Sequence, residues 1–286
     1  MADVYRSDVD HSYDREQTAN AYDAYGEQEW ERHEKAPMHR VSFHLHRHYL
    51  KEFIRSGDRV LEAGAASGRF TVELARLGAT IVVTDISPGQ LELNVANIAE
   101  AGLESAVEAR ALADIVDLSA YADGEFDAIV CYGGPLSHVM DRADQALLEL
   151  LRVTKRGGYL LLGVMSLHGS VHAFLASVDA EIQEFGIDEE QAIVETGDLP
   201  SDHSSMGTPA HLFSWDELRA LLERHDCDLV VASAANFLSI GNDEICERWL
   251  QDREMWERFL RWEVVSCAQP GAIDAGTHII AVVRAR

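Results

Sequence analysis

The sequence predicts an α/β fold in which helices cover both faces of a mostly parallel sheet. Apolar strand patterns alternate with helix patterns from residue 59 to residue 166, as in successive βαβ units. The segment FDAIVCYGG (126–134) is almost uniformly apolar, as expected for a parallel strand buried on both faces. The segment VLEAGAASGRF (60–70) reads as a strand, a glycine-containing loop and a helix, an arrangement that often holds a nucleotide.

The individual elements follow from local patterns. Ser87 is a good N-cap with Pro88 at the first helical position, and Ser214 with Glu217 forms a capping box. Strands are predicted at 59–63, 80–86, 106–113, 126–134, 157–166, 227–234 and 276–285. Helices are predicted at 67–78, 87–102, 142–154, 214–226 and 243–265.

Two segments depart from this rhythm. Residues 1–58 are predicted to form an N-terminal helical arm that acts as a lid. Residues 167–213 interrupt the pattern inside the main domain, which we expect to span 59–286. The interruption is too long for a plain connection, and we expect it to hold one helix near 170–185 and to cap the substrate.

The charge balance limits the possible partners. Asp and Glu total 49 against 24 Lys and Arg, only three of them lysine, and the formal net charge is −25. This acidity argues against a nucleic-acid partner. No apolar run approaches the roughly 20 residues of a membrane span, and the polar N-terminus does not read as a secretory signal. Together with four widely spaced cysteines, this predicts a cytoplasmic protein. The composition resembles that of proteins from salt-loving archaea, although an ordinary acidic bacterial protein remains the alternative.

Glycines and acids at the strand ends carry the functional signal. Gly64, Ala66 and Gly68 occupy glycine-type positions in the loop after the first strand, and Glu62 precedes them. Asp85 ends the second strand, where a carboxylate can accept both hydroxyls of a ribose. Further signals are the segments LADIVDL (112–118) and LLRVTKRGGYLLL (150–162).

In this order, these segments resemble the motifs of class I S-adenosylmethionine (SAM)-dependent methyltransferases. The resemblance covers about 57–166 and the ending 214–286, and it implies a seven-stranded sheet of order 3-2-1-4-5-7-6 with the last strand antiparallel. SAM would be the cofactor and S-adenosylhomocysteine the product, with Asp114 near the adenine amine. Ala66 departs from the usual middle glycine. The residues expected to bind the cofactor are Glu62, Gly64, Ala65, Gly68, Asp85, Ile86, Gln90, Ala113, Asp114 and Tyr132.

The same resemblance implies methyl transfer to a small-molecule acceptor by in-line displacement, in which the protein mainly aligns the two reactants. His138 follows the fourth strand and is the candidate acid, base or substrate contact; packing or capping is its alternative role. No metal site is predicted, since His44 and His48 share a helix face without a third ligand. A homodimer is possible.

Two rival functions remain open at this point. One is a SAM-binding protein that does not transfer a methyl group, because this chemistry requires no obligatory catalytic residue. The other is a nicotinamide-dependent oxidoreductase, against which the glycine pattern and Asp114 argue.

We predict that salt stabilises this protein. Its net charge of −25 creates self-repulsion, and the Debye length falls from about 10 Å at 0.1 M salt to about 3 Å at 1 M. The melting temperature, measured at pH 7 by calorimetry, should therefore rise between these KCl concentrations. A flat or falling melting temperature would contradict this prediction.

Overall fold

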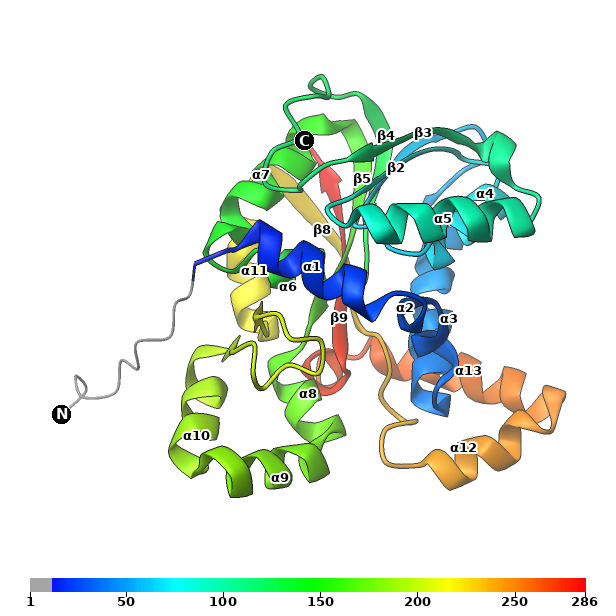
Figure 1. Cartoon of the computed structure of the whole chain (residues 1–286). Coiled ribbons are helices and arrows are strands. Elements are labelled where there is room, and N and C mark those ends of the chain that lie inside the picture. Colours follow the sequence, from blue (N-terminus) through cyan, green and yellow to red (C-terminus); the bar gives the residue numbers. More distant parts are fainter. Residues whose placement is uncertain (1–11) are drawn as a thin grey trace.

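Seven strands form the central sheet of the computed structural model, which describes residues 12–286 (Figure 1). Their order is β3-β2-β1-β4-β5-β9-β8, and β9 runs antiparallel to both of its neighbours. This confirms the predicted order with its reversed last strand. The strands are β1 (Arg59–Ala63), β2 (Thr80–Asp85), β3 (Val107–Leu112), β4 (Phe126–Cys131), β5 (Thr154–Met165), β8 (Cys227–Ala234) and β9 (His278–Ala285).

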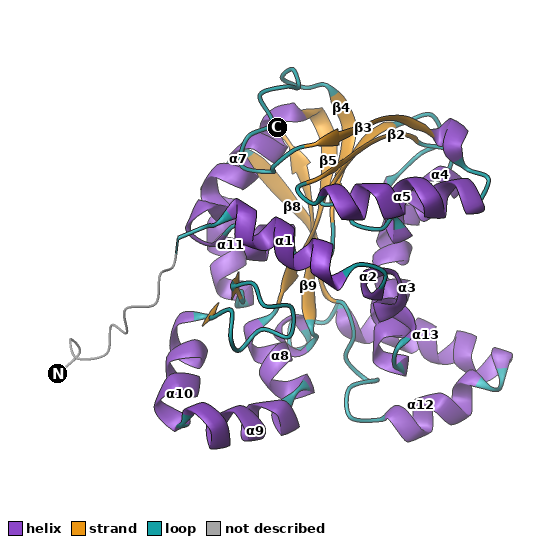
Figure 2. Cartoon of the chain, in the orientation of Figure 1, coloured by secondary structure: helices purple, strands orange, loops and turns teal. Residues whose placement is uncertain are grey.

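Helices cover both faces of the sheet (Figure 2). Leu61 on β1 packs into the hydrophobic core on the side of α7 and α11, whereas its neighbour Val60 packs into the core on the side of α3 and α4. This alternation follows from the two-residue period of a strand. The covering helices are α3 (Pro37–Phe53), α4 (Arg69–Arg76), α5 (Pro88–Glu100), α7 (Ala143–Val153), α11 (Trp215–Glu223), α12 (Asp243–Leu250) and α13 (Arg253–Cys267).

Side chains begin several helices at the predicted residues. The Ser87 hydroxyl accepts a hydrogen bond from the Gln90 amide at 3.0 Å, and the Ser214 hydroxyl accepts one from the Glu217 amide at 3.2 Å. Each bond satisfies a backbone N–H that the first helical turn leaves free. The starts of α5 and α11 therefore confirm the capping predictions.

The helix predicted over 243–265 is instead two helices. α12 ends at Leu250, and α13 begins at Arg253 after Asp252, whose backbone is extended with φ −112°. The Asp252 carboxylate accepts from the Met255 amide at 3.1 Å and so caps the new helix. The break was missed because an aspartate within a charged helix pattern also reads as a solvated surface residue.

The insertion also holds more structure than the one helix predicted for it. It contains α8 (Leu167–Ala173), α9 (Leu175–Phe185), α10 (Ile187–Thr196) and a small two-stranded ladder of β6 (Asp198–Leu199) and β7 (Ala210–His211). The segment between β6 and β7 returns to the main domain, where the Pro209 carbonyl contacts His138.

The N-terminal region divides into two parts with different positions. α3 belongs to the core, since Val41, Leu45 and Leu50 are fully buried against the sheet. By contrast, α1 (Arg15–Tyr25) and α2 (Gln28–Glu31) lie near the carboxyl ends of the parallel strands (Figure 1). Residues 1–11 of the predicted arm lie outside the described residues.

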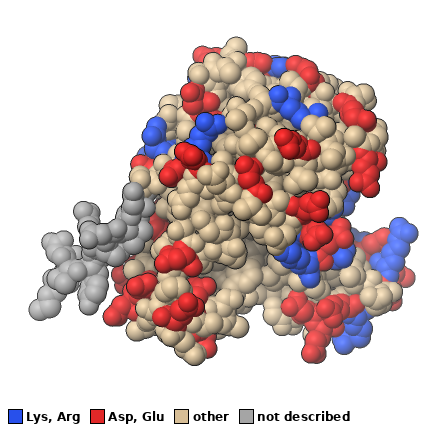
Figure 3. All heavy atoms as spheres, in the orientation of Figure 1, with Lys and Arg blue, Asp and Glu red and all other residues tan. Residues whose placement is uncertain are grey.

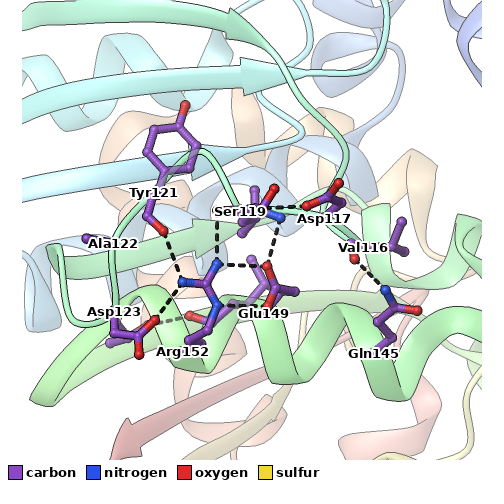
Figure 4. A network of polar contacts seen from close by, with 12 residues as sticks. Val116, Asp117, Ser119, Tyr121, Ala122, Asp123, Gln145, Glu149 and Arg152 are labelled. Carbon is purple, nitrogen blue, oxygen red and sulfur yellow. Dashed lines mark hydrogen bonds and ion pairs between the residues drawn. The ribbon is translucent and has the colours of Figure 1, made fainter.

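Arg152 on α7 fixes the connection between β3 and β4 (Figure 4). Its guanidinium donates to the carbonyls of Tyr121 at 3.0 Å and Leu118 at 2.9 Å, and it pairs with Glu149 at 2.8 Å. Glu149 in turn accepts from the Leu118 amide at 2.9 Å. These charge-assisted bonds hold the segment that begins with Asp114 against the helix.

The surface matches the composition. Acidic side chains are spread over the face seen in Figure 3, with fewer basic ones among them. Within residues 12–286, the helices are too short or too polar to cross a bilayer.

Candidate functional site

A pocket lies where the loops after β1, β2, β3 and β4 meet, and residues of α1 and α2 complete its wall. The space between its walls is about 560 Å³, which includes space open to solvent at its mouth. This position is expected, because open α/β sheets bind ligands at the carboxyl ends of their strands. The predicted site residues that line it are Gly64, Asp85, Ile86, Ala113, Asp114, Tyr132 and His138.

The loop after β1 has left-handed backbone conformations both at Gly64 and at Ala66. Gly64 has φ +74°, and a Cβ added there would lie 2.4 Å from the side chain of Pro135. Ala66 also adopts a left-handed conformation, with φ +46°, which costs about 1–2 kcal/mol for a residue other than glycine. Its amide donates to Asp85 at 2.7 Å, and this bond helps to hold the conformation.

Asp85 is positioned to accept hydrogen bonds from a ligand. One of its oxygens accepts from the Ala66 amide at 2.7 Å and the other from the Ser87 amide at 2.9 Å. A carboxylate offers about four lone-pair sites, and the Ile86 amide also lies against this one, so room remains for a ribose hydroxyl. Burial raises the pKa of Asp85 to about 6, and the group is therefore mainly ionised at pH 7.

Asp114 already has a partner from the arm. It accepts from the Tyr13 hydroxyl at 2.8 Å and from the Val116 amide at 3.0 Å. Burial and the nearby Asp114 raise the pKa of Tyr13, so this residue remains a neutral donor. Tyr13 therefore binds the carboxylate that we expect to meet the adenine amine.

Other predicted residues lie behind the loop rather than in the pocket. Glu62 accepts from the Thr71 hydroxyl at 2.6 Å, and burial raises its pKa to about 8. Gly68 has φ +96°, and an added Cβ would lie 2.8 Å from the Asn94 amide. Ala65 is buried under the same loop. These residues shape the loop from below, and none of them is among the pocket-lining residues.

Gln90 holds the arm in place. Its side-chain amide donates to the carbonyls of Tyr22 at 2.9 Å and Gly26 at 3.0 Å, at the end of α1. Asp23 on the same helix accepts from the Ser87 hydroxyl and, at 2.9 Å, from the Gly89 amide. The first turn of α5 thus anchors α1.

His138 connects the arm, the turn after β4 and the insertion. Its Nδ1 lies 3.0 Å from the Pro209 carbonyl and its Nε2 lies 3.1 Å from the Tyr22 hydroxyl. Because a carbonyl only accepts, Nδ1 carries the proton and the lone pair of Nε2 faces Tyr22. Burial lowers the pKa of His138, which keeps the ring neutral at pH 7.

Several further pocket residues come from the arm and were not predicted. Glu29 and Arg32 form an ion pair at 2.7 Å, and both face the pocket. Burial raises the pKa of Glu29 although Arg32 opposes the shift. Tyr13, Thr18 and this pair were missed because a helical arm carries no local pattern that says which strand ends it will cover.

The central part of the chain matches a known protein family. Residues 60–158 match the model of a family described as a methyltransferase domain. The chain carries a methyltransferase domain in this region. Every strand end that forms the pocket belongs to this matched part.

Curated relatives match the methyltransferase domain in part. The chain is 38% identical over 105 residues to an uncharacterised protein of Mycobacterium tuberculosis, covering 37% of this chain and 36% of the relative. It is 35% identical over 127 residues to the ubiquinone biosynthesis O-methyltransferase of Xanthomonas oryzae, covering 44% and 50%. The chain thus matches half or less of the length of these relatives.

Solved structures share the fold over most of the chain. The [4+2]-cyclase SpnF has a TM-score of 0.62 at 18% identity, covering 98% of this chain and 99% of that one. A chain from the Haloferax volcanii complex of the Trm112 activator with a putative methyltransferase has a TM-score of 0.60 at 18% identity, covering 93% and 96%. A Burkholderia thailandensis 1,6-didemethyltoxoflavin-N1-methyltransferase has a TM-score of 0.53 at 15% identity, covering 95% and 90%.

We predict that replacing Asp85 with alanine weakens S-adenosylhomocysteine binding by about 10- to 150-fold. This corresponds to the roughly 1.5–3 kcal/mol of hydrogen bonds to a charged acceptor. Calorimetric titration of the variant measures the loss, and Glu92→Gln, an exposed acid on α5, serves as the control. Unchanged affinity in Asp85→Ala would remove Asp85 from the binding site.

Proposed function

We propose that this protein transfers a methyl group from SAM to a small-molecule acceptor. The observation that carries the proposal is the convergence of Gly64, Asp85, Asp114 and His138 on one pocket. The first three of these residues have the chemistry that a nucleoside with a positively charged tail requires. The fourth directs a lone pair toward the space where an acceptor would enter.

The pocket residues divide naturally among the parts of the cofactor. Asp85 retains a lone-pair position for the ribose, and Asp114 takes the adenine amine in place of the Tyr13 hydroxyl. Glu29 and Arg32 match the ammonium and the carboxylate of the methionine part in sign. Gly64 leaves room for close approach because it has no side chain.

In this proposal the chain acts mainly by positioning. The methyl group of SAM is already activated, so the protein contributes alignment and exclusion of water. His138 Nε2 accepts the proton of the acceptor O–H or N–H, and its Nδ1–H stays on the Pro209 carbonyl, which fixes the ring. The acceptor takes the place of the Tyr22 hydroxyl, which now occupies Nε2.

A small acceptor fits this site better than a macromolecule. The pocket is covered by α1, and the Thr18 hydroxyl meets the Thr208 hydroxyl of the insertion at 3.1 Å. The curated relative from Xanthomonas oryzae is named for ubiquinone biosynthesis, and the Burkholderia thailandensis structure holds 1,6-didemethyltoxoflavin with S-adenosylhomocysteine. A cytoplasmic location and a homodimer remain predictions.

The test of the function is S-adenosylhomocysteine formation with panels of phenols, catechols and heterocyclic amines. Turnover of one acceptor class, with calorimetric SAM binding, would support methyl transfer. Tight SAM binding without turnover on any panel would favour a SAM-binding protein that does not transfer a methyl group.

With a reactive acceptor in hand, we predict that His138→Ala lowers kcat by about 10²- to 10⁴-fold, the usual contribution of general base catalysis. Its S-adenosylhomocysteine affinity should stay within a few-fold of the wild type. Since burial lowers the pKa of His138, the wild-type rate should be level at neutral pH and fall only in acid, where Nε2 becomes protonated. Wild-type kcat in His138→Ala would exclude the base role, and His168→Ala, an exposed histidine on α8, is the control.

A further inference from the structure

The insertion contains a buried cluster that the pocket does not use. Glu181 lies on α9, Glu190 lies on α10 after the turn at Gly186, and His203 follows β6. One ligand atom from each of the three side chains lies within 4.8 Å of the others. The two helices that carry the glutamates, α9 and α10, lie at the lower left in Figure 1.

Two atoms in this cluster have no hydrogen-bond partner among the described residues. They are Nδ1 of His203, whose side chain is 1% exposed, and Oε2 of Glu190, which is 6% exposed. A buried polar atom without a partner destabilises the folded state. Two such atoms in one small cluster indicate that a further group belongs there.

The contact of His203 Nε2 indicates which kind of group fits beside Nδ1. His203 Nε2 lies 3.4 Å from Glu189, whose carboxylate accepts a hydrogen bond from Nε2–H. The lone pair of Nδ1 then faces the carboxylate of Glu181 at 3.6 Å. Negative and lone-pair atoms repel each other unless a cation lies between them. In metal sites, a ligating histidine commonly donates its other ring N–H to a carboxylate, which fixes the orientation of the ring.

We propose that Glu181, Glu190 and His203 bind a divalent zinc-class cation. One imidazole nitrogen with two carboxylate oxygens suits zinc, whereas magnesium and calcium prefer oxygen ligands alone. Tetrahedral bonds of about 2.0–2.2 Å place ligand atoms about 3.4 Å apart. The half-exposed Glu181 closes the remaining gap, and water takes the fourth position.

The site would also bear on the pocket through the loop that carries His203. Further along this loop, the Thr208 hydroxyl meets α1 and the Pro209 carbonyl accepts from His138. The cation ties the start of the loop to α9 and α10. The sequence predicts no metal site here because the spacing of the three residues, 181, 190 and 203, matches no familiar metal-binding motif.

The test is calorimetric titration of untagged, chelator-treated full-length protein with ZnCl₂. We expect one equivalent to bind to the wild type and to raise its melting temperature. His203→Ala and Glu190→Gln should lose this binding by at least tenfold, and Glu189→Gln should weaken it by about 10- to 100-fold. Glu190→Gln is nearly isosteric, so it remains informative if the alanine variant fails to fold.

Matched controls separate the site from general zinc binding by an acidic surface. Glu184→Gln on α9 and His168→Ala on α8, both exposed, should bind zinc like the wild type. Equal zinc binding by all variants would overturn the proposal, and so would displacement of zinc by an equal concentration of magnesium. S-adenosylhomocysteine affinity, measured in the same variants, reports on the pocket independently.

Discussion

The rest of the structure depends on one constraint, the change between β1 and β4 in the direction in which the chain adds strands to the sheet. From β1 the chain builds outward through β2 to β3, and from β4 it builds outward the other way. The loops that leave β1 and β4 therefore diverge and open a crevice at the carboxyl edge. Gly64 and Pro135 meet across this line so closely that a Cβ on Gly64 would lie 2.4 Å from the proline ring. The crevice therefore admits only glycine at its narrowest point.

Closure of this crevice joins three distant parts of the chain. On α1, Thr18 forms a hydrogen bond with the insertion and Tyr22 forms one with His138. Tyr13, just before the helix, donates a hydrogen bond to Asp114. The bonds of Thr18 and Tyr22 join neutral groups and contribute about 0.5–1.5 kcal/mol net each, whereas the bond from Tyr13 to the Asp114 carboxylate contributes about 1.5–3 kcal/mol. A ligand that makes equivalent hydrogen bonds to Asp114 and His138 can replace those of the two tyrosines, which supports the prediction that the arm acts as a lid.

The shared fold does not decide the reaction. The structure with a TM-score of 0.62 is described as a [4+2]-cyclase, and methyltransferases share the same sheet. A fold of this kind hosts several chemistries, so function has to be argued from the side chains in the pocket. Here the arguments are the acids at the ends of β2 and β3 and the oriented lone pair of His138.

The sequence by itself determined the strands, the glycine loop and the acids at the strand ends, because two-residue and helical periodicities and capping residues such as Ser87 act over short distances. Tertiary structure decided the rest. Asp252 ends a helix only where the chain turns, and Glu62, predicted in the site, lies behind its loop instead. Arg32 meets the distant strand ends only through the packing of the arm, and His203 meets Glu181 and Glu190 only through the fold of the insertion. No local pattern encodes such contacts, because they depend on how the arm and the insertion pack onto a completed sheet.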